Sequence, residues 1–214
     1  MNEAPPEAPK DCPLCPRLVG YREQNKRAEP TWFNGAAPSF GDPDARLLIV
    51  GLAPGRTGAN RTGRPFTGDY AGDLLYATLK RLGLAEGEYR ADPSDGFTLI
   101  GAMITNAVRC APPENKPTPA EIATCRPFLA SRIAALPQLR AIMALGSIAH
   151  ESVLRAHDLK PTAAKFGHGV EAALPNALTL ISSYHCSRYN TQTRRLTADM
   201  FEAVMTRAKA LAKL

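Results

Sequence analysis

Three side chains that could take part in catalysis stand at the ends of separate segments of the chain. Asp69 closes a glycine-rich stretch, residues 51–69, while Asn106 and His185 each follow a short apolar run. A carboxylate can orient water, an amide can read the donors and acceptors of a base edge, and an imidazole can donate a hydrogen bond. Each residue also has an ordinary structural role, since Asp69 can cap a helix, Asn106 can close a turn and His185 can be a structural histidine.

The glycine-rich stretch, GLAPGRTGANRTGRPFTGD, directly follows the apolar run Leu47–Val50. Its five glycines permit tight turns and the close approach of a flat or anionic ligand. The stretch is neither a P-loop, because the Gly-Lys-Ser/Thr ending is missing, nor a dinucleotide-binding fingerprint, because the glycine spacing differs. Phe66 within it is either a side chain buried in the core, which is the commoner case, or a platform on which a base stacks.

The cysteines form a second candidate site. Cys12 and Cys15 make a Cys-Pro-Leu-Cys motif, and Cys110 and Cys125 are separated by fourteen residues. If the fold brings these four thiolates together, they suit either a structural zinc or an iron–sulfur cluster, and the spacing alone does not decide between them. The alternative is a redox Cys-x-x-Cys motif with unrelated buried thiols. Cys186 stands apart from this group.

A basic segment near the C-terminus, CSRYNTQTRRL, mixes arginines with hydroxyl, amide and aromatic side chains. This mixture suits contacts to DNA phosphates together with a side chain inserted into the helix. A solvated basic loop is the alternative reading. The residues concerned are Ser187, Arg188, Tyr189, Arg194 and Arg195.

Four short apolar runs predict the buried strands that would position these side chains. The runs are Leu47–Val50, Thr98–Ile104, Ala141–Leu145 and Leu178–Ser182. The segments between them predict a helix over residues 70–82, a helix after the capping box Thr118–Glu121, and an amphipathic helix after Thr197. Strands that alternate with helices predict a parallel sheet covered on both faces, with ligand sites beyond the carboxyl ends of the strands. The candidate catalytic side chains are therefore expected on one rim.

The composition indicates one globular domain. The chain has 214 residues, of which 44% are hydrophobic, and a formal net charge of +6, which is compatible with a polyanionic partner. Residues 1–10 predict a flexible lead-in, and residues 11–214 a single domain. The absence of a membrane span or secretory leader predicts a cytoplasmic protein with reduced cysteines. No feature predicts a membrane contact or an obligate protein partner, so a monomer is expected.

Five stretches together resemble the iron–sulfur uracil-DNA glycosylases, and family 5, the b-type branch, most closely. They are CPLC, GLAPGRTGANRTGRPFTGDYAGDLL, TNAVRCAPPENKPTPAEIATC, ALGSIAH and YHCSRYNTQTRRLT, and they span the chain from about Asp11 to its last helix. Family 4 is similar in its cysteines, but it carries Glu where this chain has Leu52.

The resemblance implies an α/β fold, a three-layer α/β/α sandwich with a four-stranded parallel central sheet. It implies a 4Fe–4S cluster on the four cysteines of the second candidate site. It also implies base-excision repair, in which the N-glycosidic bond of uracil in double-stranded DNA is hydrolysed after base flipping. Hypoxanthine, xanthine and other deaminated or modified bases are the further substrates expected for this branch.

The resemblance also assigns roles to residues. Asp69 would position water, His185 would stabilise the departing base and Asn106 would recognise it. The base and sugar would lie against Gly51, Leu52, Ala53, Pro54, Gly55, Phe66 and Asn106. The DNA backbone and the space that the flipped base leaves in the duplex would be contacted by Arg61, Arg64, Ser187, Arg188, Tyr189, Arg194 and Arg195.

Three departures from the superfamily pattern leave substrate breadth and rate open, and the first of them also keeps a non-catalytic function open. Ala53 stands where many members place Asp or Asn, Arg56 and Thr57 follow Gly55 where Ala and His are expected, and Cys186 replaces a proline and would bring a thiol near the DNA. A non-catalytic uracil-DNA binding protein with the same pocket is the first alternative. An iron–sulfur redox protein is the second.

Overall fold

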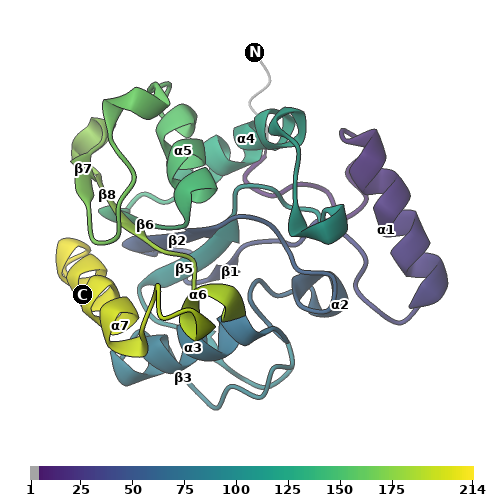
Figure 1. The fold of residues 1–214 in the computed structure, drawn as a ribbon, viewed down its shortest axis with the longest axis horizontal. Helices are drawn as coiled ribbons and strands as arrows, with labels where there is room; N and C mark the ends of the chain where they lie inside the picture. The colour runs from purple at the N-terminus through teal and green to yellow at the C-terminus, as the bar shows by residue number, and fades with distance from the viewer. Residues whose placement is uncertain (1–4) are drawn as a thin grey trace.

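A computed structural model describes residues 5–214 and has a six-stranded mixed sheet at its centre (Figure 1). The strand order is β1-β5-β2-β6-β8-β7, in which the inner four strands are parallel and the two edge strands are antiparallel to their neighbours. The strands are β1 (Phe40–Gly41), β2 (Leu47–Gly51), β5 (Ala102–Asn106), β6 (Ala141–Leu145), β7 (Glu171–Ala173) and β8 (Thr179–Ser183). The four-stranded parallel centre is therefore confirmed, and the whole sheet is wider than predicted.

One predicted strand is wrong in its extent. The run Thr98–Ile104 is divided between β4 (Thr98–Leu99), which pairs with β3 (Ala85–Glu86) in a separate two-stranded sheet, and β5 of the main sheet. Gly101 has a φ of +61°, a left-handed conformation that turns the chain between the two strands. The edge strands β1 and β7 have two and three residues, too few to show a period of two in the sequence.

The helices follow their capping signals. Asp69 accepts a hydrogen bond from the backbone N–H of Gly72 at 2.9 Å, and the capping box of Thr118 and Glu121 is present. The helices are α1 (Pro16–Ala28), α2 (Ala59–Thr62), α3 (Tyr70–Arg81), α4 (Pro119–Ala134), α5 (Ser147–Ala156), α6 (Arg188–Gln192) and α7 (Ala198–Leu211), with 3-10 turns at Pro113–Asn115, Pro161–Ala163 and Pro175–Ala177. The predicted helices correspond to α3, α4 and α7.

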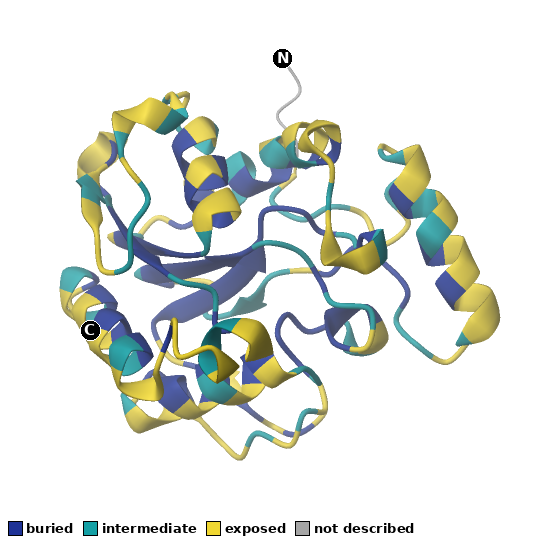
Figure 2. Ribbon diagram, viewed as in Figure 1, coloured by how far each residue is buried: buried dark blue, intermediate teal, exposed yellow. Residues whose placement is uncertain are grey.

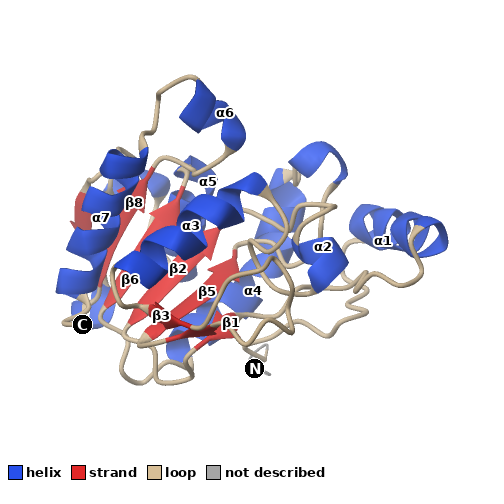
Figure 3. Ribbon diagram, turned by 90° about the horizontal axis from the view of Figure 1, so that it is seen from below, coloured by secondary structure: helices blue, strands red, loops and turns tan. Residues whose placement is uncertain are grey.

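The sheet is the middle layer of a three-layer sandwich. Along β2, Leu47 and Ile49 pack on the side of α3 and α7, whereas Leu48 and Val50 pack on the side of α4 and α5. Both faces of the strands are consequently buried, as the dark ribbon in Figure 2 shows, and the helices cover the sheet from both sides (Figure 3).

The loops that follow the parallel strands meet at one edge of the sheet. Gly51 and Asn106 are paired at the ends of β2 and β5. The two chains then continue side by side, because Ala107 N–H donates to the Gly51 carbonyl and Val108 N–H donates to the Leu52 carbonyl, both at 2.9 Å. The glycine-rich stretch and the segment leading to Cys110 are thereby held together.

The N-terminal segment contacts the domain from Pro6 onward, since the Pro6 carbonyl accepts a hydrogen bond from Arg109. The Glu7 carboxylate accepts hydrogen bonds from the Ser39 backbone and from Arg109, each at 2.9 Å, and also from Arg132. The sequence predicted flexibility across residues 1–10, of which residues 1–4 lie outside the described part of the chain. Within residues 5–214, no helix has both the length and the apolar character that crossing a membrane requires.

Candidate active site

A cavity of about 430 Å³ opens at the carboxyl edge of the sheet. It lies beside the end of β2 and collects side chains from segments far apart in the sequence. Its lining comprises Leu52, Ala53, Pro54, Gly55, Arg56, Thr57, Phe66, Asp69, Ala71, Asn106, Asn115, His185 and Ser187. The three candidate catalytic residues are thus brought together, as the arrangement of the strands predicted.

Gly51, at the end of β2, lies between the Asn106 and Phe66 side chains but is not among the residues that line the cavity. A Cβ atom at this position would lie 2.6 Å from Cζ of Phe66 and would also overlap Oδ1 of Asn106. Only glycine lets both side chains approach the end of β2 this closely.

The Asn106 side chain has an unsatisfied acceptor. The residue is buried, and no described residue donates a hydrogen bond to its Oδ1 atom. Burying an amide oxygen without a partner is costly, and such atoms are rare in folded proteins. The Asn106 side chain also lines the cavity, so it is a candidate contact for a ligand that carries a hydrogen-bond donor.

Phe66 is both a core residue and a wall of the cavity. Its side chain is 7% exposed and packs in the cluster with Leu47 and Leu75, and its ring centroid lies 6.1 Å from that of His185 with 29° between the ring planes. Its φ of 55° is a left-handed conformation that is uncommon for a residue with a side chain. The structure confirms that Phe66 is a core residue and also places it in the cavity lining, while stacking on a base stays a prediction.

The two carboxylate oxygens of Asp69 have different surroundings in the structure. Its Oδ1 caps α3, and its Oδ2 lies against the glycine-rich stretch, because a Cβ atom would be 2.6 Å from it at Gly58 and 3.5 Å from it at Gly55. Burial raises the pKa of the Asp69 carboxyl above its ordinary value. The ionised form is therefore held in a poorly solvated place beside the cavity.

His185 enters the cavity from the loop after β8. The amide of Asn190 donates to its backbone carbonyl at 2.8 Å, which fixes the loop. Burial lowers the pKa of the His185 imidazole, so the ring is neutral at pH 7 and can donate one hydrogen bond.

The expectation that Cys186 brings a thiol near the DNA is wrong. Its side chain is fully buried and lies 3.5 Å from the carbonyl of Ala71 at the start of α3. Burial raises the pKa of this thiol to about 12, so it remains protonated and serves as a packing group.

Of the predicted DNA-contacting residues after β8, one lines the cavity and the others are exposed in the segment that follows it. Ser187 caps α6 and lines the cavity, and Tyr189 is 71% exposed. The Arg188 guanidinium lies 5.4 Å from the centre of the Tyr70 ring, and Arg195 lies 4.8 Å from that of Tyr184. Arg61 and Arg194 are also exposed.

The prediction that Arg64 contacts DNA is wrong. Its side chain is 4% exposed and its guanidinium donates two hydrogen bonds of 2.8 Å to Asp95, whose side chain is completely buried. A phosphate cannot reach this guanidinium. The sequence offered no sign of the pairing, because the two residues are separated by thirty others in the chain.

Several lining residues were missed from the sequence, among them Arg56 and Asn115. The Arg56 side chain donates to Asn25 Oδ1 at 2.8 Å and lies 5.0 Å from the centre of the Trp32 ring. Asn115 belongs to the proline-rich loop after β5, and its position beyond the carboxyl end of a strand was the signal that could have identified it.

The four cysteines of the second candidate site line one small cavity, together with Leu18 and Phe128. They come from the start of α1, the segment after β5, and α4. Burial raises the pKa of Cys110 to about 12 and that of Cys125 to about 11, so these thiols would need a bound cation to ionise at neutral pH.

Within residues 5–214, no group of three or more histidine, cysteine, aspartate or glutamate side chains is placed so that it could hold a metal ion. Four cysteines around one cavity are the usual donor set of a four-iron cluster, so the residues present fit such a group, and the same set can hold a structural zinc.

Comparison with known proteins agrees with this geometry. The family model of the uracil DNA glycosylase superfamily matches residues 38–209. A type-5 uracil-DNA glycosylase of Thermus thermophilus is 49% identical over 95% of this chain and 94% of its own length, and one of Pyrobaculum aerophilum is 40% identical over 94% and 88%. A type-4 uracil-DNA glycosylase of Pyrobaculum aerophilum is 35% identical over 68% of this chain and 60% of its own. The match to the superfamily covers the loops that build the cavity, and the type-5 relatives cover nearly the whole chain, so the protein belongs to the uracil-DNA glycosylase superfamily and to its type-5 branch.

Proposed function

We propose that the protein is a monofunctional glycosylase that hydrolyses the N-glycosidic bond of uracil in double-stranded DNA, with the target base flipped into the cavity beside β2. The Asn106 side chain carries this proposal, because it lines the cavity with Phe66 and His185 and its buried Oδ1 has no hydrogen-bond donor among the described residues. The relatives named type-5 uracil-DNA glycosylases support the same reaction class.

Asn106 would select the base by its hydrogen-bonding edge. Uracil offers an N3–H donor to Oδ1 and an O4 acceptor to the amide N–H, so both pairs are complementary. Cytosine offers an acceptor at N3 and a donor at N4, so both pairs would be mismatched. Phe66 would supply a stacking face for the flipped base.

The reaction itself would depend on His185 and Asp69. As the bond breaks, the sugar gains oxocarbenium character and the departing base gains negative charge. The neutral imidazole of His185 would donate a hydrogen bond to the base carbonyl, which is typically worth ~3 kcal/mol in the transition state. The Asp69 carboxylate would orient the attacking water and stabilise the cationic sugar, since Ala53 supplies no acidic group. The C1′–N bond breaks and the base leaves as an anion, water adds to C1′ and releases one proton to solvent to leave the 1′-hydroxyl, and the base anion takes up one proton from solvent.

DNA would bind across the mouth of the cavity. The exposed Arg61, Arg188, Arg194 and Arg195 would contact phosphates, and Ser187 would add a hydroxyl. Tyr189, at 71% exposed, would enter the space that the flipped base vacates. Flipping costs a few kcal/mol and is least costly at a mismatch such as G·U. We expect a monomer to act.

The open cavity also suits other deaminated bases. Its volume of about 430 Å³ and the small Ala53 side chain leave room for a base larger than uracil. Hypoxanthine and xanthine present an N–H donor beside a carbonyl on the edge that Asn106 would read. We propose them as secondary substrates.

The function is tested by incubating the protein with a duplex that contains one G·U pair and treating it with alkali, which breaks the strand at abasic sites. Strand breaks with G·U and none with a matched G·C duplex are expected. Tight binding to the G·U duplex without base release would instead make this protein a non-catalytic uracil reader.

We propose that Cys12, Cys15, Cys110 and Cys125 hold a 4Fe–4S cluster. Bound there, it would connect α1, the segment after β5 and α4, which are far apart in the sequence, and so stabilise the fold beside the active site. Purified protein should be brown and contain about four iron and four sulfide ions per chain, measured by metal and sulfide analysis. Stoichiometric zinc without iron would contradict this assignment.

A further inference from the structure

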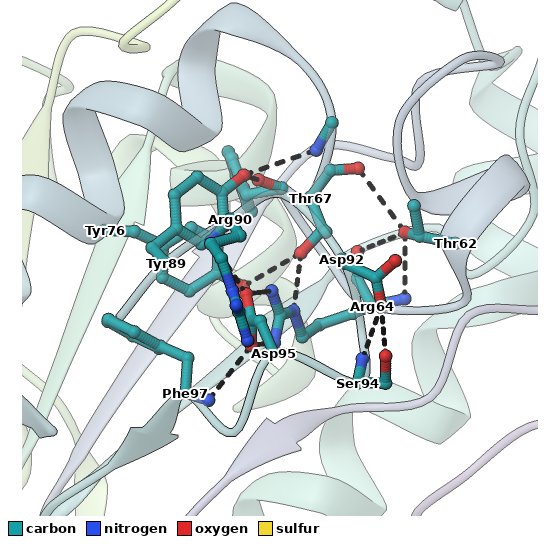
Figure 4. A network of polar contacts seen from close by, with 12 residues as sticks. Thr62, Arg64, Thr67, Tyr76, Tyr89, Arg90, Asp92, Ser94, Asp95 and Phe97 are labelled. Carbon is teal, nitrogen blue, oxygen red and sulfur yellow. Dashed lines mark hydrogen bonds and ion pairs between the residues drawn. The ribbon is translucent and has the colours of Figure 1, made fainter. Parts of the chain in front are cut away.

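A polar network, shown in Figure 4, is attached to the backbone of Phe66, whose side chain lines the cavity. Its centre is the ion pair of Arg64 and Asp95, in which two parallel hydrogen bonds of 2.8 Å join the guanidinium to the carboxylate. The carboxylate also accepts the backbone N–H groups of Arg90 and Phe97, at 3.0 and 2.9 Å. The network therefore ties the loop of residues 90–97 to the glycine-rich stretch.

Two tyrosines hold the backbone on either side of Phe66. The Tyr76 hydroxyl donates to the Pro65 carbonyl at 2.6 Å, and the Tyr89 hydroxyl donates to the Phe66 carbonyl at 3.3 Å. Tyr89 also accepts from the Gly68 N–H at 3.3 Å.

The same network orients the two tyrosine rings. They stack with centroids 4.5 Å apart, and the Arg64 guanidinium lies 5.5 Å from the centre of one ring and 5.6 Å from the other. The Arg64 Nε atom also donates to the Thr67 hydroxyl at 2.7 Å. Each residue from 64 to 68 is thus attached to this network.

Phe66 needs such support because its backbone is in the left-handed region, at a φ of 55°. Its carbonyl oxygen lies against the first turn of α3, where a Cβ atom at Gly72 would overlap it. The N–H of Gly72 donates to Asp69 in turn. The positions of the stacking ring and of the catalytic carboxylate are therefore coupled through one short segment.

We propose that Tyr89, supported by the Arg64–Asp95 ion pair, is a positioning residue that holds Phe66 in its strained conformation so that the ring meets the flipped base. This inference rests on the proposed function. Tyr89 is not among the residues that line the cavity, and its hydroxyl bonds the Phe66 carbonyl, so it acts through Phe66 and not on the substrate.

The test removes a single hydroxyl group. Breaking the ion pair with Asp95→Asn would leave the Arg64 charge buried without its partner, which can unfold a protein. Tyr89→Phe keeps the stacked ring and deletes only the two hydrogen bonds to the Phe66 segment. Tyr76→Phe, which frees the Pro65 carbonyl, is a second variant, and Tyr21→Phe on α1 is the matched control outside the network.

The expected result is a five- to tenfold fall in kcat/KM for the G·U duplex with Tyr89→Phe, about the value of one ordinary hydrogen bond. Tyr21→Phe should match the wild type. The decisive measurement is a double-mutant cycle with Phe66→Ala, because Tyr89→Phe should have no further effect once the ring is gone. Thermal unfolding of each variant should show that the fold is retained.

Three results would overturn the inference. Two are full activity of Tyr89→Phe and full activity of Phe66→Ala. The third is an equal reduction in kcat/KM by Tyr89→Phe with and without the Phe66 ring, which would indicate a purely structural role. Failure of the proposed function is distinguishable from all of these, because the wild type would then release no base.

Discussion

Asp69→Asn should slow uracil release from a G·U duplex by roughly 10²- to 10⁴-fold, the range of a positioned acid–base group. The physical reason is the loss of the one negative charge that the described cavity lining places beside the scission site. The fold should be retained, because an asparagine oxygen can also accept the Gly72 N–H that caps α3. The measurement is the single-turnover rate at saturating enzyme, with the affinity for the duplex determined in parallel.

Asp73→Asn provides a matched control for this experiment. Asp73 is exposed on the first turn of the same helix and does not line the cavity, so the substitution makes the same change of charge nearby. Its rate should stay close to that of the wild type. Equal rates for the two variants would show that Asp69 is a helix cap and nothing more.

The pH dependence should identify the same group. Because burial raises the pKa of Asp69, its carboxylate takes up a proton at a higher pH than an ordinary aspartate as the solution is acidified. The ionised form is the active one, so activity should fall through that raised pKa. The residual activity of Asp69→Asn should lack this acid limb.

His185→Ala should lower the rate of uracil release by about 10²- to 10³-fold, the usual cost of removing one preorganised donor to a developing oxyanion. The loss should appear in kcat and much less in KM, because the hydrogen bond strengthens only as the base becomes anionic. Rates measured over a range of duplex concentrations separate the two constants. His185→Gln retains an N–H donor and should recover part of the rate.

His157→Gln is the control for this second experiment, since His157 lies away from the cavity, near the C-terminal end of α5. A rise in KM at unchanged kcat for His185→Ala would contradict the assignment of His185 to the departing base. Burial lowers the pKa of His185, so protonation of its ring should affect the rate only in more acidic solution than it would for an ordinary histidine.

The sequence predicted the parts of the fold that depend on neighbouring residues. Helices α3, α4 and α7 begin where Asp69, Thr118 and Thr197 cap them, since a cap and its helix are adjacent in the chain. The inner strands were recognisable because strands buried on both faces are continuous apolar runs. The convergence of Asp69, Asn106 and His185 followed from the parallel order of these strands alone, and the family followed from the motifs.

Only the tertiary structure decided which way individual side chains of the loops face. Arg64 and Arg61 are indistinguishable as basic residues of one glycine-rich stretch, but Arg64 is buried against Asp95 and Arg61 is exposed. Cys186 is likewise turned into the core, toward Ala71. The unsatisfied oxygen of Asn106 is also a tertiary feature, because it depends on every group around it. Capping and periodicity are local and can be read along the chain, whereas burial and pairing depend on residues that only the folded chain brings together.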